Sequence, residues 1–340
     1  MKPVVVIAVC LTTLWSAACY AVDSMPQEHS YEGMDYVSAA VALTEDTFIA
    51  AGSQDNILRI YRIADSTAPV AQCDVSDFLG LSGEPADVRG AARIADRIYW
   101  ITSHSRDEDG RIRRARYRFF ATTIKEENGR FIIDPVGRPC STLLDKLPNL
   151  NTVSTLRLDK AMRLREELSE KQRQKLAPTR EGLNIGALCA DPHTDILFIG
   201  FRNPRPVRVT TGRPHALVVP LNNAADVVVK GAEPIFGEAM LWDFDGLGIT
   251  GIEYSPIHRM YFIVAQPHDS ASPCILYRWS GMKANPPERV CRLSFTDKET
   301  TDAALVPFES SRKWLLLTGH PDAPGTVPLG KHFQGVWIQP

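Results

Sequence analysis

The sequence has little excess of charge of either sign. Its 38 Lys and Arg residues stand against 40 Asp and Glu residues, which leaves a formal net charge of −2. A chain balanced in this way exerts no long-range attraction on nucleic acid or on an anionic membrane surface. The 44% of hydrophobic residues is ordinary for a globular protein with a large core. The composition therefore argues against a nucleic-acid partner.

Common catalytic and metal-binding motifs are also missing. There is no Gly-x-Ser-x-Gly nucleophile elbow and no Cys-x-x-Cys pair. Cys189 and His193 stand four residues apart, but a turn-forming Asp-Pro lies between them. We therefore expect a strand end and a turn there rather than a zinc site. No long uncharged apolar run follows the first residues, so we expect no membrane-spanning segment in the mature chain.

The N-terminus has the features of an export signal. Lys2 is followed by the apolar run "VVVIAVCLTTLW" and then by the small residues of "SAACYA". We predict that residues 1–21 are a cleaved signal peptide and that 22–340 form one domain, in the periplasm or secreted. In the alternative, the signal is that of a lipoprotein, Cys19 carries a lipid anchor, and the protein resides at the outer membrane.

Export gives the remaining cysteines access to an oxidising compartment. Cys274 and Cys291 flank a predicted hairpin, so we predict a disulfide across it. Cys73 with Cys140 is a second candidate pair. Cys189 lies in the apolar run "IGALCAD" and is expected to be a buried free thiol.

A loose repeat runs along the chain. Each unit has a small-residue approach, a strand, a turn and a very hydrophobic strand, and polar-alternating strands such as "NILRIYRIAD" and "ILYRWSG" follow. The units are "YEGMDYVSAAVALTEDTFIAAGS", "DVRGAARIADRIYWITSH", "NIGALCADPHTDILFIGFRN", "GITGIEYSPIHRMYFIVAQ" and "TDAALVPFESSRKWLLLTGH". This pattern predicts an all-β protein, a β-propeller of five to seven blades, with "HFQGVWIQP" as the strand that closes the ring.

Two segments depart from the simple blade pattern. Residues 156–178 carry leucines at helical spacing among many charges, which predicts one inserted amphipathic helix that ends at Pro178. This helix is either a lid over one mouth of the ring or, as we favour, a surface helix packed on a blade edge. The run "RRARYRFF" alternates, which predicts an outer strand with Arg114, Arg116 and Arg118 on its wet face.

Several motifs resemble those of an uncharacterised bacterial family, domain of unknown function 3616. They are "DRIYWITSHSRDEDGRIRRARYRFFATTI", "KLAPTREGLNIGALCADPHTDILFIGFRNP", "GRPHALVVPLNN", "DFDGLGITGIEY", "LYRWSG" and "HFQGVWI", and they span nearly all of the mature chain. The resemblance implies a propeller and brings no assigned activity.

The chain departs from that family's pattern at equivalent positions of the repeats. Arg89 and Gly186 stand where the family has acids, and Thr250 stands where it has an arginine. If these positions ring one mouth of the channel, the ring has been lost or altered in this chain. Glu32, in "YEGMDY", would be a surviving acid of the ring.

Three acids are candidates for a metal site. Glu32, Asp35 and Asp87 lie near the starts of predicted inner strands, which converge at the channel of a propeller, and carboxylates there would hold Ca²⁺ or another hard cation. The alternative, which we favour, is that these acids cap turns or pair with Arg89.

Three cationic residues are candidates for ligand binding. His104 and Arg106 follow a buried strand, at a blade edge near a mouth, and Arg202 would grip a phosphate or carboxylate if it leans into the channel. Ser103 and Ser105 flank His104, but neighbouring residues of a strand point to opposite faces, so we expect no Ser–His catalytic pair. "RDEDGR" has the composition of a hairpin turn.

Two hypotheses about function follow. The first is an exported propeller that binds a small ligand or a protein partner and performs no chemistry. The second is a metal-dependent, Ca²⁺-type hydrolase of phosphoesters or lactones, with His104 or Arg202 assisting at the channel mouth. We favour the first, because no catalytic motif is present and two acids of the family pattern are missing.

Overall fold

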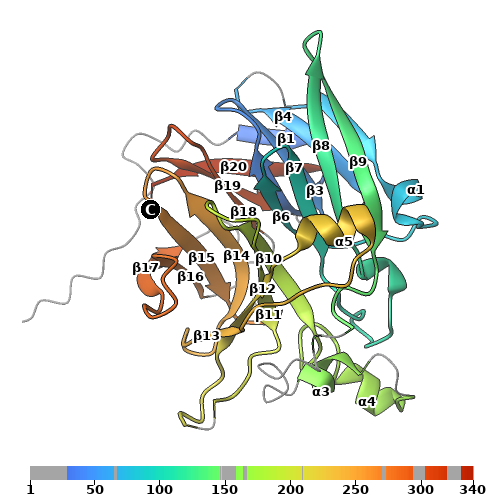
Figure 1. The fold of residues 1–340 in the computed structure, drawn as a ribbon, viewed down its shortest axis with the longest axis vertical. Coiled ribbons are helices and arrows are strands. Elements are labelled where there is room, and N and C mark those ends of the chain that lie inside the picture. The colour runs from blue at the N-terminus through green and yellow to red at the C-terminus, as the bar shows by residue number, and fades with distance from the viewer. Residues whose placement is uncertain are drawn as a thin grey trace, which may run out of the picture.

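Five antiparallel sheets of four strands each build the protein in the computed structural model (Figure 1). The structure describes residues 29–64, 67–145, 147, 158–163, 167–208, 210–269, 273–293, 303–319 and 331–339. The five sheets are the blades of a propeller, so the prediction of an all-β propeller is confirmed and the number of blades is five. The predicted signal peptide and Cys19 lie outside the described residues.

Four blades are meanders of consecutive strands. Blade 1 contains β2 (Val37–Ala42), β3 (Thr47–Gly52), β4 (Ile57–Arg62) and β5 (Ala71–Asp74), and blade 2 contains β6 (Val88–Ile94), β7 (Arg97–Thr102), β8 (Phe119–Glu127) and β9 (Arg130–Cys140). Blade 3 contains β10 (Asn184–Ala190), β11 (Leu197–Asn203), β12 (Ala216–Leu221) and β13 (Met240–Trp242), and blade 4 contains β14 (Gly248–Ser255), β15 (Met260–Gln266), β16 (Cys274–Trp279) and β17 (Glu288–Leu293).

The fifth blade joins the two ends of the chain. It contains β18 (Ala303–Pro307), β19 (Trp314–Gly319), β20 (His332–Ile338) and, at its outer edge, β1 (His29–Glu32) from the N-terminal side. His29 pairs with Gly335 and Glu32 with His332 in this antiparallel ladder. The prediction that "HFQGVWIQP" closes the ring is therefore confirmed, and the closure is made by backbone hydrogen bonds between the chain ends.

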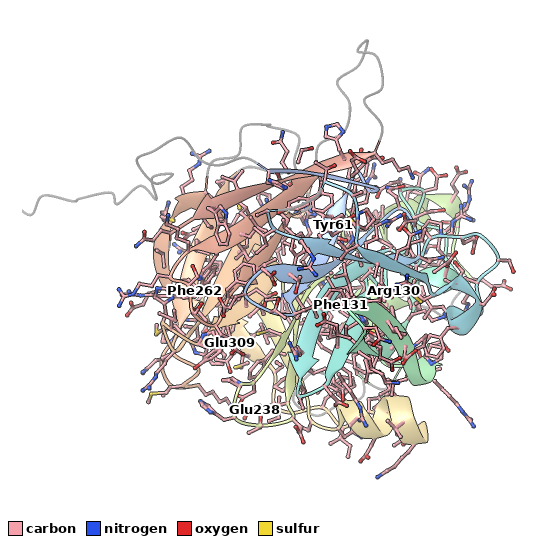
Figure 2. The ribbon with its side chains drawn as sticks, turned by 90° about the horizontal axis from the view of Figure 1, so that it is seen from above. Tyr61, Arg130, Phe131, Glu238, Phe262 and Glu309 are labelled. Carbon is pink, nitrogen blue, oxygen red and sulfur yellow. The ribbon has the colours of Figure 1, made fainter. Side chains whose placement is uncertain are left out.

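Side chains between neighbouring blades form the core (Figure 2). The faces of blades 5 and 1 meet in a cluster of aromatic residues that includes Tyr31, Phe48, Tyr61 and Phe333, all of them fully buried. Blades approach so closely at the axis that some positions have no room for a side chain. A Cβ at Gly90 of β6 would lie 2.5 Å from the backbone nitrogen of Leu188 on β10. This close approach explains the small residues of the repeat.

The insertion before blade 3 is not the single amphipathic helix predicted over 156–178. The structure has two short helices there, α3 (Leu158–Met162) and α4 (Glu170–Gln174), drawn at the bottom of Figure 1. Ser169 starts the second helix, because its side chain and that of Gln172 form a capping box. A good N-cap inside a leucine-spaced stretch therefore divides it into two elements.

The insertion packs on blade 2 and its connecting segment. Arg106 donates a hydrogen bond to the carbonyl of Arg163 at 3.1 Å, and Gly110 lies so close to Arg173 that a Cβ would meet the Arg173 carbonyl at 1.9 Å. These contacts agree with the reading of helices packed against a blade. Two further short helices, α1 (Ser76–Leu79) and α5 (Ala224–Lys230), follow outer strands. No described helix is long and apolar enough to cross a membrane.

The predicted disulfide between Cys274 and Cys291 is wrong. Cys274 is a free thiol whose cross-strand partner is Leu293, whereas Cys291 lies opposite Leu276. The two cysteines are thus diagonal neighbours, about 7–8 Å apart, which is too far for an S–S bond. Cys73 and Cys140 are also free thiols, so that pairing is wrong too.

Cys189 agrees with its prediction. Its thiol is free and its side chain is buried in β10, within the apolar contacts between blades 3 and 4. Burial raises the pKa of this thiol well above its ordinary value. Cys189 is therefore a core residue rather than a reactive one.

Candidate ligand site at the channel mouth

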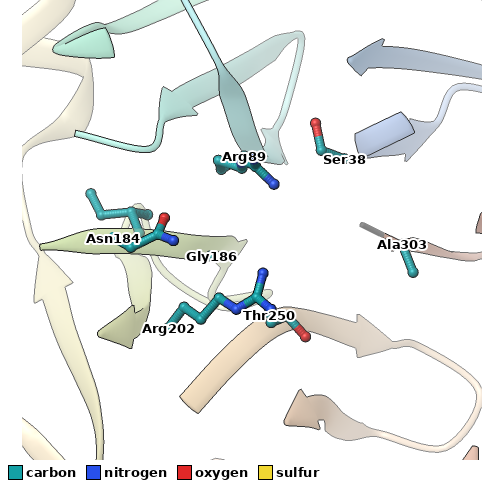
Figure 3. Close-up of a pocket in the computed structure, with 8 residues that line it drawn as sticks. Ser38, Arg89, Asn184, Gly186, Arg202, Thr250 and Ala303 are labelled. Atoms are coloured by element: carbon teal, nitrogen blue, oxygen red, sulfur yellow. The ribbon is translucent and has the colours of Figure 1, made fainter. Parts of the chain in front are cut away.

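A ring of residues from all five blades surrounds one end of the central channel (Figure 3). Each of the innermost strands β2, β6, β10, β14 and β18 contributes at least one residue near its start. They are Ser38, Arg89, Gly186, Thr250 and Ala303, and Asn184, Ile185 and Arg202 complete the lining of the cavity. Arg89, Gly186 and Thr250, the three positions at which the chain departs from the family pattern, thus lie around the same cavity.

A shared backbone irregularity places four of these residues. The pairing of the innermost strand with its neighbour shifts register across Ser38, Arg89, Gly186 and Thr250, so each is an extra residue without a partner in the ladder. Such a β-bulge re-aims the side chain at the bulged position. The repeat thus builds the ring by repeating the bulge, while the residue type at the bulge varies from blade to blade.

Arg89 is held by a neighbouring carboxylate. Its Nε donates to Oδ1 of Asp87 at 2.7 Å, and the other oxygen of Asp87 lies 3.7 Å from Nη1 of Arg116. Asp87 is only 4% exposed, and its backbone has a φ of 60°, in the left-handed region. The reading in which Asp87 pairs with Arg89 is therefore the one that the structure shows.

Arg202 reaches the cavity from the second strand of blade 3. Its Nε and Nη2 donate to the carbonyl of Pro267 at 3.4 and 3.3 Å, and the residue is 9% exposed. Burial lowers the pKa of the nearby His268, and the positive charges of Arg205 and Arg202 lower it further, against the opposing charge of Asp269. The Arg202 side of the channel mouth is therefore cationic.

Asn184 is a site residue that sequence reasoning missed. It is the first residue of β10, is 9% exposed and lines the cavity, into which its amide points (Figure 3). A polar residue at a strand start has the pattern of a turn or cap, so its identity alone did not mark it. Ser38 was also missed. Its hydroxyl donates to the carbonyl of Val88 on the neighbouring blade at 2.5 Å.

The enclosed space is small. Its volume is about 20 Å³, which exceeds the ~10–15 Å³ that one water molecule needs but is far below the ~300 Å³ of a typical ligand pocket. A ligand at this mouth can therefore place only a head group of a few atoms between the blades. Of the lining residues that the structure describes, none carries a carboxylate and two carry guanidinium groups, so this part of the ring is suited to an anion.

The three acids proposed for a metal are not brought together. Glu32 is exposed at the end of β1, where it accepts a hydrogen bond from Thr67 at 2.9 Å, and neither it nor Asp35 lines the cavity. Asp87 is engaged by arginines, as described above. Within the described ranges no group of three or more His, Cys, Asp or Glu side chains is placed to hold a metal ion.

His104 lies in the buried segment that follows β7 and does not line the cavity. Its Nδ1 lies 3.0 Å from the carbonyl of Thr102 and must donate to it, which leaves Nε2 as a buried acceptor with no partner. Burial lowers the pKa of His104 to about 4, its bond to Thr102 opposes this, and the charge of Arg118 adds to it. The imidazole is therefore neutral at pH 7. As expected, it forms no hydrogen bond with Ser103, whose hydroxyl instead meets that of Ser105 at 2.9 Å.

Arg106 connects the segment after β7 to the helical insertion by hydrogen bonds. Its guanidinium donates to the carbonyls of Gly110 at 2.9 Å and Arg163 at 3.1 Å, so it fixes the segment after β7 against the helical insertion. Asp107 closes the turn by accepting the backbone N–H of Arg111 at 2.7 Å. "RDEDGR" is thus a hairpin tip, as its composition predicted.

Comparison with known proteins adds little. No protein-family model matches the chain, and no curated protein matches it. Among solved structures, it is similar to the Trypanosoma rangeli sialidase in complex with 2,3-difluoro-KDN, with 11% identity and a TM-score of 0.42 over 85% of this chain and 44% of that one. The PQQ-bound aldose sugar dehydrogenase of Streptomyces coelicolor gives 11% identity and a TM-score of 0.39, over 94% and 99% of the two chains.

A luciferin-regenerating enzyme gives 8% identity and a TM-score of 0.42, with 93% of this chain and 95% of that chain covered. The chain spans less than half the length of the sialidase. At these identities and scores, the likenesses bear on no activity of this chain, and the propeller is established by its own strand pairing.

Proposed function

We propose that this protein is an exported binding propeller that captures a ligand by an anionic group at the channel mouth and performs no chemistry on it. The proposal includes the N-terminal signal peptide, a place in the periplasm or outside the cell, and kinship with the family that its motifs resemble. The lipoprotein anchored at Cys19 stays the alternative for the anchoring.

One observation carries the proposal. Arg89 and Arg202, from neighbouring blades, line the same small cavity, and none of the described residues that line it carries a carboxylate. A guanidinium has five N–H donors in a fixed plane, and it can hydrogen-bond protein acceptors and an anion at the same time. Two such groups beside one small cavity favour an anion there.

The metal-dependent hydrolase has less support. Glu32 and Asp35 do not line the cavity, and Asp87 is bound by two arginines. His104 is buried outside the cavity and is neutral, so of the two residues that were to assist only Arg202 lies at the cavity.

The test uses residues 22–340, purified without the signal. Thermal unfolding is followed at constant ionic strength while sodium acetate, phosphate or sulfate replaces sodium chloride. A ligand that binds only the folded state raises the midpoint by mass action. We expect at least one oxyanion to raise it, and Arg89→Gln or Arg202→Gln to abolish the effect.

The matched control is Arg111→Gln, which removes an equal charge from the exposed hairpin tip, where Arg111 pairs with Asp109. This variant should respond to the anion like the wild type. If no oxyanion stabilises the wild type, or if both channel variants respond unchanged, the proposed function is wrong.

A further inference from the structure

The side chain of Asn184 is nine-tenths buried and faces the cavity. Among the residues that the structure describes, none hydrogen-bonds to its amide. The amide atoms are not among the buried polar atoms that lack a partner, so they are accessible from the cavity and available to a group that enters it. This observation is independent of the two arginines.

The cross-strand neighbour of Asn184 shows the contrast. Asn203 pairs with Asn184 between β10 and β11, and its amide donates to the carbonyls of Gly182 at 2.5 Å and Arg180 at 3.1 Å. Asn203 thereby holds the end of the helical insertion in place. Of two asparagines that pair across the strands, one thus donates its amide N–H groups to the backbone, while the other presents its amide to the cavity.

The other polar residues of the ring face the cavity differently. The hydroxyl of Ser38 donates a hydrogen bond to the Val88 carbonyl at 2.5 Å, and the hydroxyl of Thr250 donates one to the Val264 carbonyl at 3.4 Å. Their oxygens therefore offer lone pairs rather than donors. The ring has its donors, Arg89, Asn184 and Arg202, on blades 2 and 3, and its acceptors on blades 1 and 4 (Figure 3).

We infer that the channel mouth recognises a carboxylate head in preference to a phosphate, and that Asn184 is the specificity-determining residue. This inference rests on the proposed anion-binding function. A carboxylate is flat and has two oxygens, which the donors of blades 2 and 3 can share. A phosphate has four oxygens in a tetrahedron, which makes it a bulkier head than a flat carboxylate for a space of about 20 Å³.

A halide is also disfavoured. A single ion accepts from one point, whereas a guanidinium presents a fork that matches two oxygens. The carboxylate has two sources with the same chemistry, a free organic acid or the C-terminus of a peptide. The test separates them by comparing a short peptide with its C-terminally amidated form.

The experiment measures dissociation constants for formate, acetate, phosphate and chloride on residues 22–340, at pH 7 and fixed ionic strength, by NMR titration. We expect formate or acetate to bind at least tenfold tighter than phosphate or chloride. Asn184→Leu, which keeps the volume and removes the amide, should weaken carboxylate binding about tenfold, the worth of one hydrogen bond to a charged group, and leave phosphate binding unchanged.

Asn184→Ser keeps a donor and serves if the leucine variant does not fold; we expect it to lose less carboxylate affinity. Tighter or equal binding of phosphate or chloride by the wild type overturns the inference, while the anion site itself survives. An unchanged carboxylate-to-phosphate ratio in both variants also overturns it. If no anion binds, the proposed function fails and the inference fails with it.

If the free-acid peptide binds tighter than acetate and its amidated form does not bind, the source is a peptide C-terminus.

Discussion

Two seams of the ring differ in what fills them. The closure seam, where blades 5 and 1 meet, is filled by Tyr31, Phe48, Tyr61 and Phe333, whose ring centroids lie 5.1–5.4 Å apart. The polar seam, where blades 2 and 3 meet at the channel mouth, contains Asp87, Ser103, His104, Asn184 and Arg202, all of them nine-tenths buried or more. The same four-stranded blade thus serves both seams.

The difference between the two seams indicates that stability and binding depend on different parts of the ring. Closure must join the ends of the chain, and aromatic pairs contribute both buried area and favourable ring geometry there. Buried polar groups cost free energy unless each is hydrogen-bonded, so the polar seam contributes less to stability than an apolar seam of the same size. It is also the seam that receives the long connections, residues 103–118 and the helical insertion. We infer that closure supplies stability and that the polar seam supplies recognition.

The largest expected effect comes from cutting the closure seam. Phe333→Ala removes a fully buried ring that stacks on Tyr31, and we expect it to lower the free energy of unfolding by about 3–5 kcal/mol. Phe131→Ala, on the half-exposed hairpin of β8 and β9, is the matched control and should cost much less. Chemical denaturation measures both.

The same variant tests the division between the seams. At a temperature where Phe333→Ala stays folded, its affinity for the channel anion should equal that of the wild type. A loss of affinity as large as that of Arg202→Gln would show that the two seams are not separate in function.

The second prediction concerns how pH changes the stability of the polar seam. The folded pKa of His104 is about 4, below the ~6.5 of an exposed histidine, so between these values the unfolded chain binds more protons than the folded one. Stability is therefore full above pH 6.5 and falls as the pH drops toward 4. The full loss is about 3 kcal/mol, from 1.36 kcal/mol for each pKa unit.

His104→Asn removes this titration. Asparagine tolerates the φ of 49° at this position and keeps a donor for the Thr102 carbonyl. Unfolding free energies at pH 7, 5.5 and 4 should fall more steeply in the wild type than in this variant, while the exposed His193→Asn should follow the wild type. Parallel curves for wild type and His104→Asn would contradict the assignment.

The fold was largely predictable because short local patterns of apolar and turn-forming residues identify each repeat. The apolar second strand of each unit and the turn before it recur, so the propeller and its closing strand followed from the residues. The number of blades did not, because connections of very different length hide the period. Arg114–Arg116 form a 3-10 turn and β8 begins only at Phe119, although the alternation predicted a strand through them. The Thr102 side chain accepts the Arg118 N–H at 2.8 Å there, in place of a regular ladder.

The site was predictable in part. Comparison of equivalent repeat positions identified Arg89, Gly186 and Thr250, because a bulge recurs at the same point of each innermost strand. Ser38 lies at the same bulge and was missed, because a serine there carries no charge that would mark it. Asn184 lies outside the bulge positions that the repeat compares, so this comparison could not find it. His104 was expected near a mouth, and only its burial shows that it belongs to the structure of the seam.

The smallest expected effect sharpens the comparison within the ring itself. A Cβ at Gly186 would lie 2.2 Å from the carbonyl oxygen of Ile249 on the next blade, so Gly186→Ala must push blades 3 and 4 apart at the mouth, at a cost of about 1–3 kcal/mol. Gly251, beside the bulge of β14, is the matched control, because a Cβ there would meet only the Val264 side chain at 3.6 Å. Gly251→Ala should be neutral or stabilising by up to about 1 kcal/mol, since it restricts the unfolded chain. Chemical denaturation of both variants gives the difference. Equal stabilities would show that the channel mouth can accommodate a methyl group. The backbone would then not fix the width of the mouth, on which the preference for a small carboxylate head depends.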